Sequence, residues 1–187
     1  MSVIYLNTPA VGAKAALVNF NFKESLIDSI HGFTATLGGS ATQGNSGVSI
    51  PSYNSRIILT EINFAIIGNI FTFEIDVGDC NINTSDGKHK RFFMWSSACG
   101  LIYRSTGYWG IYGNDWYMTT ISDKDFFKNS TVKIACNKNN IKLYRNNQLV
   151  HEFNINSYLS SGNSYNLYIG SNDQSAHNMI IEGFRVY

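Results

Sequence analysis

Hydrophobic alternation in the last third of the chain constrains the fold more than any other feature. Apolar residues take every second position in residues 132–136 and again in 141–143, and Asn-rich segments interrupt these runs. A period of two is typical of strands that bury one face. Residues 137–140 and the pair Asn146 and Asn147 tolerate the positive φ that tight hairpin turns need. The sequence therefore predicts consecutive antiparallel strands, in a register that a one-residue slip would destroy.

Other segments match a known domain pattern: VKIACNKNNIKLYRNNQLVHEF, then YNLYIGS followed by IIEGFRVY, and LVNFNFKESLIDSIHG near the N-terminus. They resemble the hairpin pair, the closing strands and the opening segment of laminin-G-like and pentraxin-like domains, in the concanavalin A-like lectin/glucanase superfamily. Asn147 stands where these domains usually have a turn glycine. The resemblance implies an all-β, two-sheet antiparallel jelly-roll sandwich with almost no helix. It implies a fold more than a function, because this sandwich hosts lectins, adhesive modules, glycosidases and virion proteins.

Length and composition agree with one sandwich domain over residues 1–187. The chain has no repeat, linker or charge block that would mark a boundary. Charged residues make up 14% of it, against about 25% in an average soluble protein, so the surface is expected to be mostly neutral and polar. With a net charge of +1 and one short basic run, residues 88–91, we expect neither nucleic-acid binding nor membrane insertion. That basic run is predicted to be a solvated hairpin end.

The alternating pattern also predicts a set of core residues and further strands. The predicted core contains Phe71, Phe73, Ile75, Val77, Val132, Ile134, Ile141, Leu143, Leu167 and Ile169. Strands are expected at residues 3–6, 15–22, 33–37, 56–62, 70–77, 92–97 and 101–104. Residues 38–47 are rich in glycine and are expected to form a flexible connection. The one candidate helix is the segment 122–129, where Ser122 can cap the first turn. It is too short to be more than a connecting turn.

The cysteines suggest where the protein folds. Cys80, Cys99 and Cys136 are odd in number and widely spaced, so we expect reduced, buried thiols. The first residues lack the basic and apolar regions of a secretory signal. Both features favour folding in a cytoplasm.

A pair of carboxylates raises the question of catalysis. Glu74 and Asp76 share one face of a predicted strand, and the text EIDVGD resembles the catalytic element of laminarinase-type glycoside hydrolases. Asp79 stands where those enzymes have a second Glu, and its side chain is one methylene shorter. Retaining hydrolysis needs carboxyl groups about 5–5.5 Å apart, which the shorter side chain strains. We therefore expect no catalytic residues.

Asp79 also begins a segment that resembles a calcium loop, with Asn81 and Asn83 at the next alternate positions. Thr84 takes the position where that loop requires glycine, and the terminal Glu is absent, so the motif fails. Laminin-G-like and pentraxin-like domains often hold calcium at a rim loop. The resemblance thus leaves calcium possible, with unknown ligands, and no other cofactor is expected.

The hairpin at residues 107–120, GYWGIYGNDWYMTT, is unusually aromatic. Its rings can serve as core, as a ligand site or as a subunit interface, because a sugar ring stacks on an aromatic face and protein partners use the same side chains. Trp116 and Tyr117 are consecutive, so they point to opposite faces and at least one ring should be accessible. The predicted ligand-binding residues are Trp109, Tyr112, Asn114, Asp115 and Trp116, with Trp109 or Trp116 as the anchoring ring.

These features favour a non-enzymatic binding or adhesion module. The specific hypothesis is a phage virion surface protein, a head decoration, a fibre component or a tail receptor-binding protein, made in the host cytoplasm. Its partners would be capsid or tail proteins and a host-surface glycan, and virion appendages are usually homo-oligomers. The alternatives are a purely structural virion protein without sugar binding and a glycoside hydrolase. A chain cut from a larger secreted or cell-surface protein would act there instead.

Overall fold

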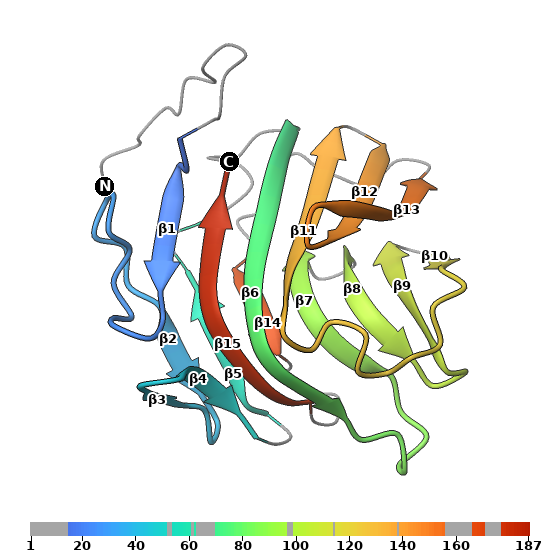
Figure 1. Cartoon of the computed structure of the whole chain (residues 1–187), viewed down its shortest axis with the longest axis horizontal. Helices are drawn as coiled ribbons and strands as arrows, with labels where there is room; N and C mark the ends of the chain where they lie inside the picture. The colour runs from blue at the N-terminus through green and yellow to red at the C-terminus, as the bar shows by residue number, and fades with distance from the viewer. Residues whose placement is uncertain are drawn as a thin grey trace.

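The computed structural model describes residues 15–51, 54–60, 62, 70–96, 99–113, 115–137, 139–155, 166–170 and 177–187. In these residues all regular secondary structure is β-strand, and the strands form two antiparallel sheets that pack face to face (Figure 1). The predicted all-β, two-sheet sandwich is confirmed. No helix among the described residues has the length and apolar character needed to cross a membrane. The strand predicted at residues 3–6 lies outside the described residues.

The eight-stranded sheet lies in front in Figure 1. Its strand order is β13-β12-β11-β6-β15-β4-β3, and β1 also pairs with β15. The strands are β1 (Val18–Asn21), β3 (Thr42–Gly44), β4 (Gly47–Ile50), β6 (Ile70–Ile82), β11 (Ser130–Asn137), β12 (Asn140–Arg145), β13 (Gln148–Asn154) and β15 (His177–Val186). The predicted turn at Asn146 and Asn147 joins β12 to β13, with φ of 49° and 63°.

The seven-stranded sheet lies behind it and has the order β10-β9-β8-β7-β14-β5-β2. The strands are β2 (Thr36–Gly38), β5 (Arg56–Leu59), β7 (Lys90–Ser96), β8 (Cys99–Arg104), β9 (Tyr108–Gly113), β10 (Asp115–Met118) and β14 (Leu167–Gly170). The aromatic hairpin forms β9 and β10, at one edge of this sheet.

The core fills the space between the sheets. Every predicted core residue is buried, with at most 3% of its surface exposed. Phe73 on β6 packs edge-on against Phe93 on β7, with ring centroids 4.9 Å apart, so the two sheets interlock through aromatic contacts. The cysteines are free and buried, as predicted. Burial raises the pKa of the Cys80 and Cys99 thiols to about 12.

One prediction about a connection was wrong. Residues 38–47 contain β3 and the start of β4 rather than a flexible connection. Gly47 has φ of 112°, and a Cβ there would lie 2.4 Å from the Ile181 carbonyl oxygen, so this glycine allows close strand approach. The segment 122–129 is a connecting turn, as predicted, with turns at residues 124–129. Their backbone bonds link Phe126 to Asp123 and Lys128 to Asp125, three residues apart.

The basic run was also predicted wrongly in part. Lys90 is fully buried, because it takes an inward-facing position opposite Tyr103 at the start of β7. Its ammonium group bonds the carboxylate of Asp86 in the preceding turn. A buried lysine needs such a partner. Only the neighbouring side chains of the run remain accessible to solvent.

Candidate functional site

The outward side of the seven-stranded sheet carries a row of apolar and aromatic side chains. The register places Trp116 opposite Tyr112, Tyr112 opposite Gly100, Gly100 opposite Met94, and Met94 opposite Tyr168. We call the following residues the aromatic face: Ile58, Met94, Gly100, Ile102, Gly110, Tyr112, Trp116, Met118 and Tyr168. They alternate along their strands with core residues, so they point away from the sandwich interior.

Two glycines leave the middle of this face without projecting side chains at their own positions. A Cβ at Gly100 would lie 2.2 Å from the Met94 sulfur, and one at Gly110 would lie 2.8 Å from the Met118 sulfur. The methionine side chains therefore lie across the glycines. Met94 and Ile102 are only 3% and 2% exposed, although they belong to the outer side of the sheet. The face thus has a thin apolar layer of its own.

Trp116 forms the polar and aromatic end of the face. Its ring centroid lies 4.8 Å from that of Tyr112 and 4.6 Å from that of His89. The guanidinium carbon of Arg104 lies over the Trp116 ring, 4.6 Å from its centroid, within the range of a cation–π contact. Trp116 and Tyr112 are both partly exposed, so this end combines ring surface with polar groups.

The surroundings of His89, beside Trp116, set its protonation state and its tautomer. Its Nδ1 accepts a hydrogen bond of 3.0 Å from the Ser105 backbone N–H. Burial lowers the pKa of His89, and the positive charges of Arg104 and Arg91 lower it further. The imidazole is therefore predominantly uncharged at pH 7, with its proton on Nε2. That atom can donate a hydrogen bond to a ligand.

The structure brings together part of the predicted site. Trp116 and Tyr112 lie in contact, whereas Tyr117 packs against the core on the opposite side of β10. Asp115 is exposed, and its Oδ1 accepts a hydrogen bond of 2.7 Å from the Trp116 backbone N–H. Asn114 lies outside the described residues.

Trp109 is not an anchoring ring for a ligand. It is fully buried, its Nε1 donates a 2.9 Å hydrogen bond to the Asp123 carbonyl oxygen, and its ring packs 4.6 Å from that of Phe127. The reason is its position on β9, where Trp109 and Ile111 share the inward side. Tyr108 and Tyr112 alternate with them and point outward.

Sequence reasoning missed His89 and Arg104. His89 belongs to the basic run before β7, and Arg104 is the last residue of β8. Each lies far from Trp116 along the chain, and only the strand order brings the three together. The one local signal was that Arg104 alternates with the core residues Leu101 and Tyr103 along β8, which predicts that its side chain points outward. This pattern does not show which strands lie beside β8.

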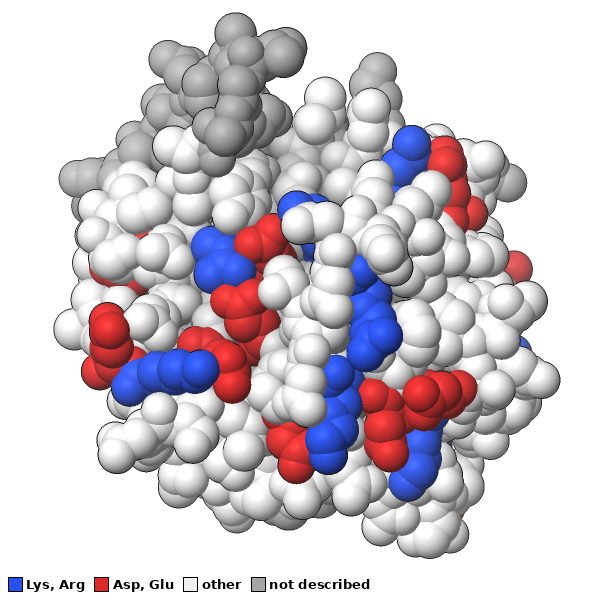
Figure 2. Space-filling model, viewed as in Figure 1, with Lys and Arg blue, Asp and Glu red and all other residues white. Residues whose placement is uncertain are grey.

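The carboxylates Glu74 and Asp76 lie on the other outer face, where acidic and basic side chains are interleaved (Figure 2). Arg185 Nη2 lies 2.7 Å from an oxygen of each carboxylate, and Lys133 Nζ lies 3.0 Å from Glu74. Burial opposes the charged form of Glu74, but Lys133 and Arg185 outweigh it and lower its pKa. A catalytic acid needs a raised pKa, so this arrangement is an ion-pair network.

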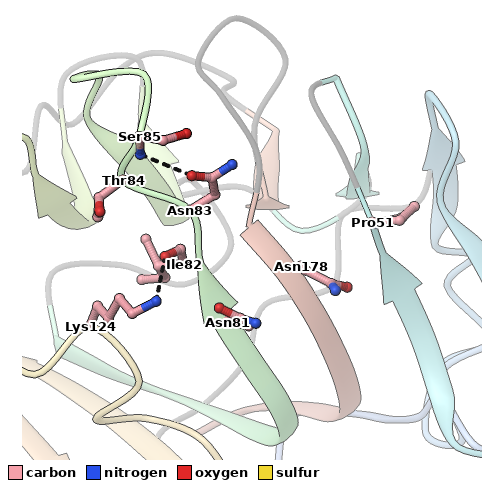
Figure 3. A pocket seen from close by; sticks show the side chains of 8 residues that line it. All are labelled: Pro51, Asn81, Ile82, Asn83, Thr84, Ser85, Lys124 and Asn178. Carbon is pink, nitrogen blue, oxygen red and sulfur yellow. Dashed lines mark hydrogen bonds between the residues drawn. The ribbon is translucent and has the colours of Figure 1, made fainter.

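A polar hollow of about 490 Å³ lies at the ends of β6 and β15 (Figure 3). It is lined by Pro51, Asn81, Ile82, Asn83, Thr84, Ser85, Lys124 and Asn178. Asn81 and Asn178 lie opposite each other on neighbouring strands. The Asn83 side-chain Oδ1 accepts a hydrogen bond from the Ser85 backbone N–H, and the Lys124 ammonium donates one to the Ile82 backbone carbonyl. The lining includes the calcium-loop segment but no aromatic ring. Within the described residues, no cluster of three or more His, Cys, Asp or Glu side chains could hold a metal ion.

Solved structures share this architecture. Domain 4 of AbnA, an extracellular arabinanase of Geobacillus stearothermophilus solved with arabinotriose, has a TM-score of 0.64 and 16% identity over 92% of this chain and 91% of its own. The receptor-binding domain of the botulinum neurotoxin C/D mosaic serotype has a TM-score of 0.68 and 16% identity over 92% of this chain and 47% of its own. The fold is the concanavalin A-like jelly roll.

A sialidase of Trypanosoma rangeli adds a third example, with a TM-score of 0.66 and 12% identity over 99% of this chain and 34% of its own. The jelly roll of this protein therefore spans nearly all of the arabinanase domain, about half of the neurotoxin domain and a third of the sialidase. No protein-family model and no curated protein sequence matches the chain. The likeness establishes the fold.

Proposed function

We propose that the protein is a non-catalytic glycan-binding module and that the aromatic face holds the glycan. The observation that carries this proposal is the contact between Trp116 and Tyr112, whose partly exposed rings lie 4.8 Å apart on an outer sheet face. The apolar side of a sugar ring stacks on such rings, while nearby polar groups bond its hydroxyls. His89 supplies one such group beside Trp116.

The extent of the face favours an oligosaccharide over a single sugar. Tyr112 on β9 and Tyr168 on β14 are three strands apart, which corresponds to about 14 Å at the usual strand spacing. Between them Gly100 contributes no side chain, and Met94 lies flat across it. A glycan laid across the strands could therefore contact the rings at both ends.

The structural neighbours support the same class of ligand. The arabinanase domain was solved with arabinotriose, and one neurotoxin structure is described by the dependence of cell entry on two ganglioside molecules. At their low sequence identity to this chain, no binding residue of these proteins can be assigned to a position here. They support the proposal as examples of one fold in carbohydrate-related proteins.

The setting expected from the sequence stays part of the proposal. A phage virion protein of this kind would attach to capsid or tail proteins, assemble as a homo-oligomer and present the aromatic face to a host-surface glycan. A secreted or cell-surface protein containing this domain would use the same face. Mass spectrometry of purified virions, compared with secreted and surface fractions, distinguishes these settings. The narrower resemblance to laminin-G-like and pentraxin-like domains likewise stays a prediction.

The binding proposal is tested with a glycan array followed by calorimetry on the best oligosaccharide. Trp116→Ala is expected to weaken binding at least tenfold, and Tyr112→Ala by less, because Trp116 has the larger ring. Lys142→Ala is the matched control, since Lys142 lies on the opposite sheet, where its partner is Glu152. Melting temperature confirms that each variant folds. Equal affinity in wild type and a folded Trp116→Ala variant would overturn the proposal.

A subunit interface is the second candidate for this face. The partly exposed rings of Tyr112 and Trp116 favour it, because protein interfaces are enriched in tyrosine and tryptophan. Light scattering after size exclusion separates the two functions. A loss of oligomer mass in Trp116→Ala, without any glycan binding by the wild type, would assign the face to self-association.

A further inference from the structure

The charges beside the aromatic face indicate a class of sugar, an inference that rests on the proposed function. Outward positions of the seven-stranded sheet include Arg56, Arg91 and Arg104, but among the described strands none holds a carboxylate. The one acid in these strands is Asp115, at the start of the edge strand β10. It takes the inward position opposite Gly113. The face is therefore basic and aromatic together.

The Arg104 side chain on this face has no acidic partner among the described residues. This side chain makes no hydrogen bond or ion pair with any residue in the described part of the chain, and its Nε is buried without a partner. Its Nη atoms are left to solvent. Arg56 differs, since its Nη1 donates to the Asn54 carbonyl oxygen. An unpaired guanidinium can receive an anion without first losing another partner.

The geometry also prepares Arg104 for recognition. Its guanidinium carbon lies over the Trp116 ring, and this contact restrains the position of the group. A planar guanidinium bonds carboxylate or sulfate oxygens in pairs. On the other sheet, Arg185 is already bonded to Glu74 and Asp76. A sheet-face arginine in this fold can thus be fully satisfied, and Arg104 is not.

We infer that the aromatic face binds an acidic glycan, in which Trp116 and Tyr112 stack on a sugar ring and the Nη atoms of Arg104 hold its carboxylate or sulfate. His89 adds a neutral donor at Nε2 next to Trp116. The remaining hydroxyls of the sugar are bound by such neutral groups. The anion supplies the negative charge that the described residues of this face lack.

The test compares acidic sugars with neutral partners of otherwise identical structure. Calorimetry with 3′-sialyllactose against lactose, and with galactose 6-sulfate against galactose, measures the preference for each anion. A glycan array of sialylated, uronate and sulfated chains with their neutral partners extends the comparison. The wild-type protein is expected to bind at least one acidic member about tenfold more tightly than its neutral partner. Added salt should weaken only the acidic member.

Arg104→Gln should remove that preference, so that the acidic sugar and its neutral partner bind with similar affinity. Arg104→Lys keeps the charge but loses the planar pair of donors, so an intermediate preference is expected. Lys142→Gln, on the opposite sheet, removes one positive charge elsewhere and should keep the full preference.

Each remaining result overturns the inference in a distinguishable way. Equal binding of acidic and neutral partners overturns it and leaves the glycan-binding proposal standing. A loss of neutral binding in Arg104→Gln would assign Arg104 to positioning Trp116 rather than to the anion. An absence of binding to every sugar overturns both this inference and the proposed function.

Discussion

The two outer faces of the sandwich differ in whether their charged side chains have partners of opposite charge. On the eight-stranded sheet, acidic and basic side chains alternate across neighbouring strands (Figure 2), and Arg185 bonds both Glu74 and Asp76. On the seven-stranded sheet, Arg104 lies on the ring of Trp116 without an acidic partner among the described residues. The first face completes its own contacts, whereas the second presents groups that a ligand can complete. The comparison therefore separates a structural surface from a binding surface within one fold.

The largest expected effect separates the two tryptophans of the aromatic hairpin. Trp109→Ala should lower the free energy of unfolding by about 3–5 kcal/mol, because it leaves a cavity beside Phe127 and Phe92. Trp116→Ala should lower it by less than half as much, since that ring lies outside the core. Urea unfolding measures both. Similar losses would mean that Trp116 is structural, and the comparison of the faces would fail.

The same hairpin shows how far the sequence could predict the site. Alternation placed Trp116 and Tyr117 on opposite sides of β10, and the core strands followed from a period of two. On β9 both sides carry large apolar side chains, with Trp109 inward and Tyr112 outward. Local pattern therefore could not decide which ring was accessible. The decision comes from packing between the sheets, where Trp109 meets Phe127.

The polar partners of Trp116 were beyond prediction for a different reason. Arg104 and His89 come from β8 and from the segment before β7, so their contact with Trp116 depends on strand order and register. A hairpin fixes only its own cross-strand pairs. The wrong assignment of Lys90 to a solvated turn has the same origin, because its inward position is set by pairing opposite Tyr103 on another strand.

The second prediction compares an arginine from each face. Arg185→Met should lower the free energy of unfolding by about 2 kcal/mol, because it leaves two neighbouring carboxylates without their shared partner. Arg104→Gln should lower it by no more than about 1 kcal/mol, the scale of its cation–π contact. Chemical denaturation of both variants under one buffer gives the comparison. A larger loss for Arg104→Gln would show that Arg104 is held for stability rather than left for a ligand.

The third prediction concerns acid stability on the paired face. Burial works against the charged form of Glu74, yet Lys133 and Arg185 lower its pKa below 4.5. A carboxylate with a lowered folded-state pKa contributes stability that is present above pH 4.5 and is lost as pH falls through the folded value. Glu74→Gln should therefore be less stable than wild type at pH 7, with a difference that shrinks toward pH 3. A difference that does not change with pH would contradict the ion-pair account.

The smallest expected effect lies on the aromatic face, where the lowered pKa belongs to a side chain that stays uncharged rather than to one that stays charged. Burial, followed by the charges of Arg104 and Arg91, lowers the pKa of His89 below 6.5. The unfolded chain therefore binds this proton more readily than the folded one between these two pKa values, so stability falls as pH drops below 6.5. His89→Gln should remove that part of the pH dependence, leaving a flatter profile from pH 6.5 to 5 in thermal melts. If the variant and the wild type lose stability in parallel over this range, His89 is not held uncharged by its neighbours. The same result would mean that the imidazole beside Trp116 is not kept neutral. The face would then lose one of the two polar groups that distinguish it from the ion-paired face.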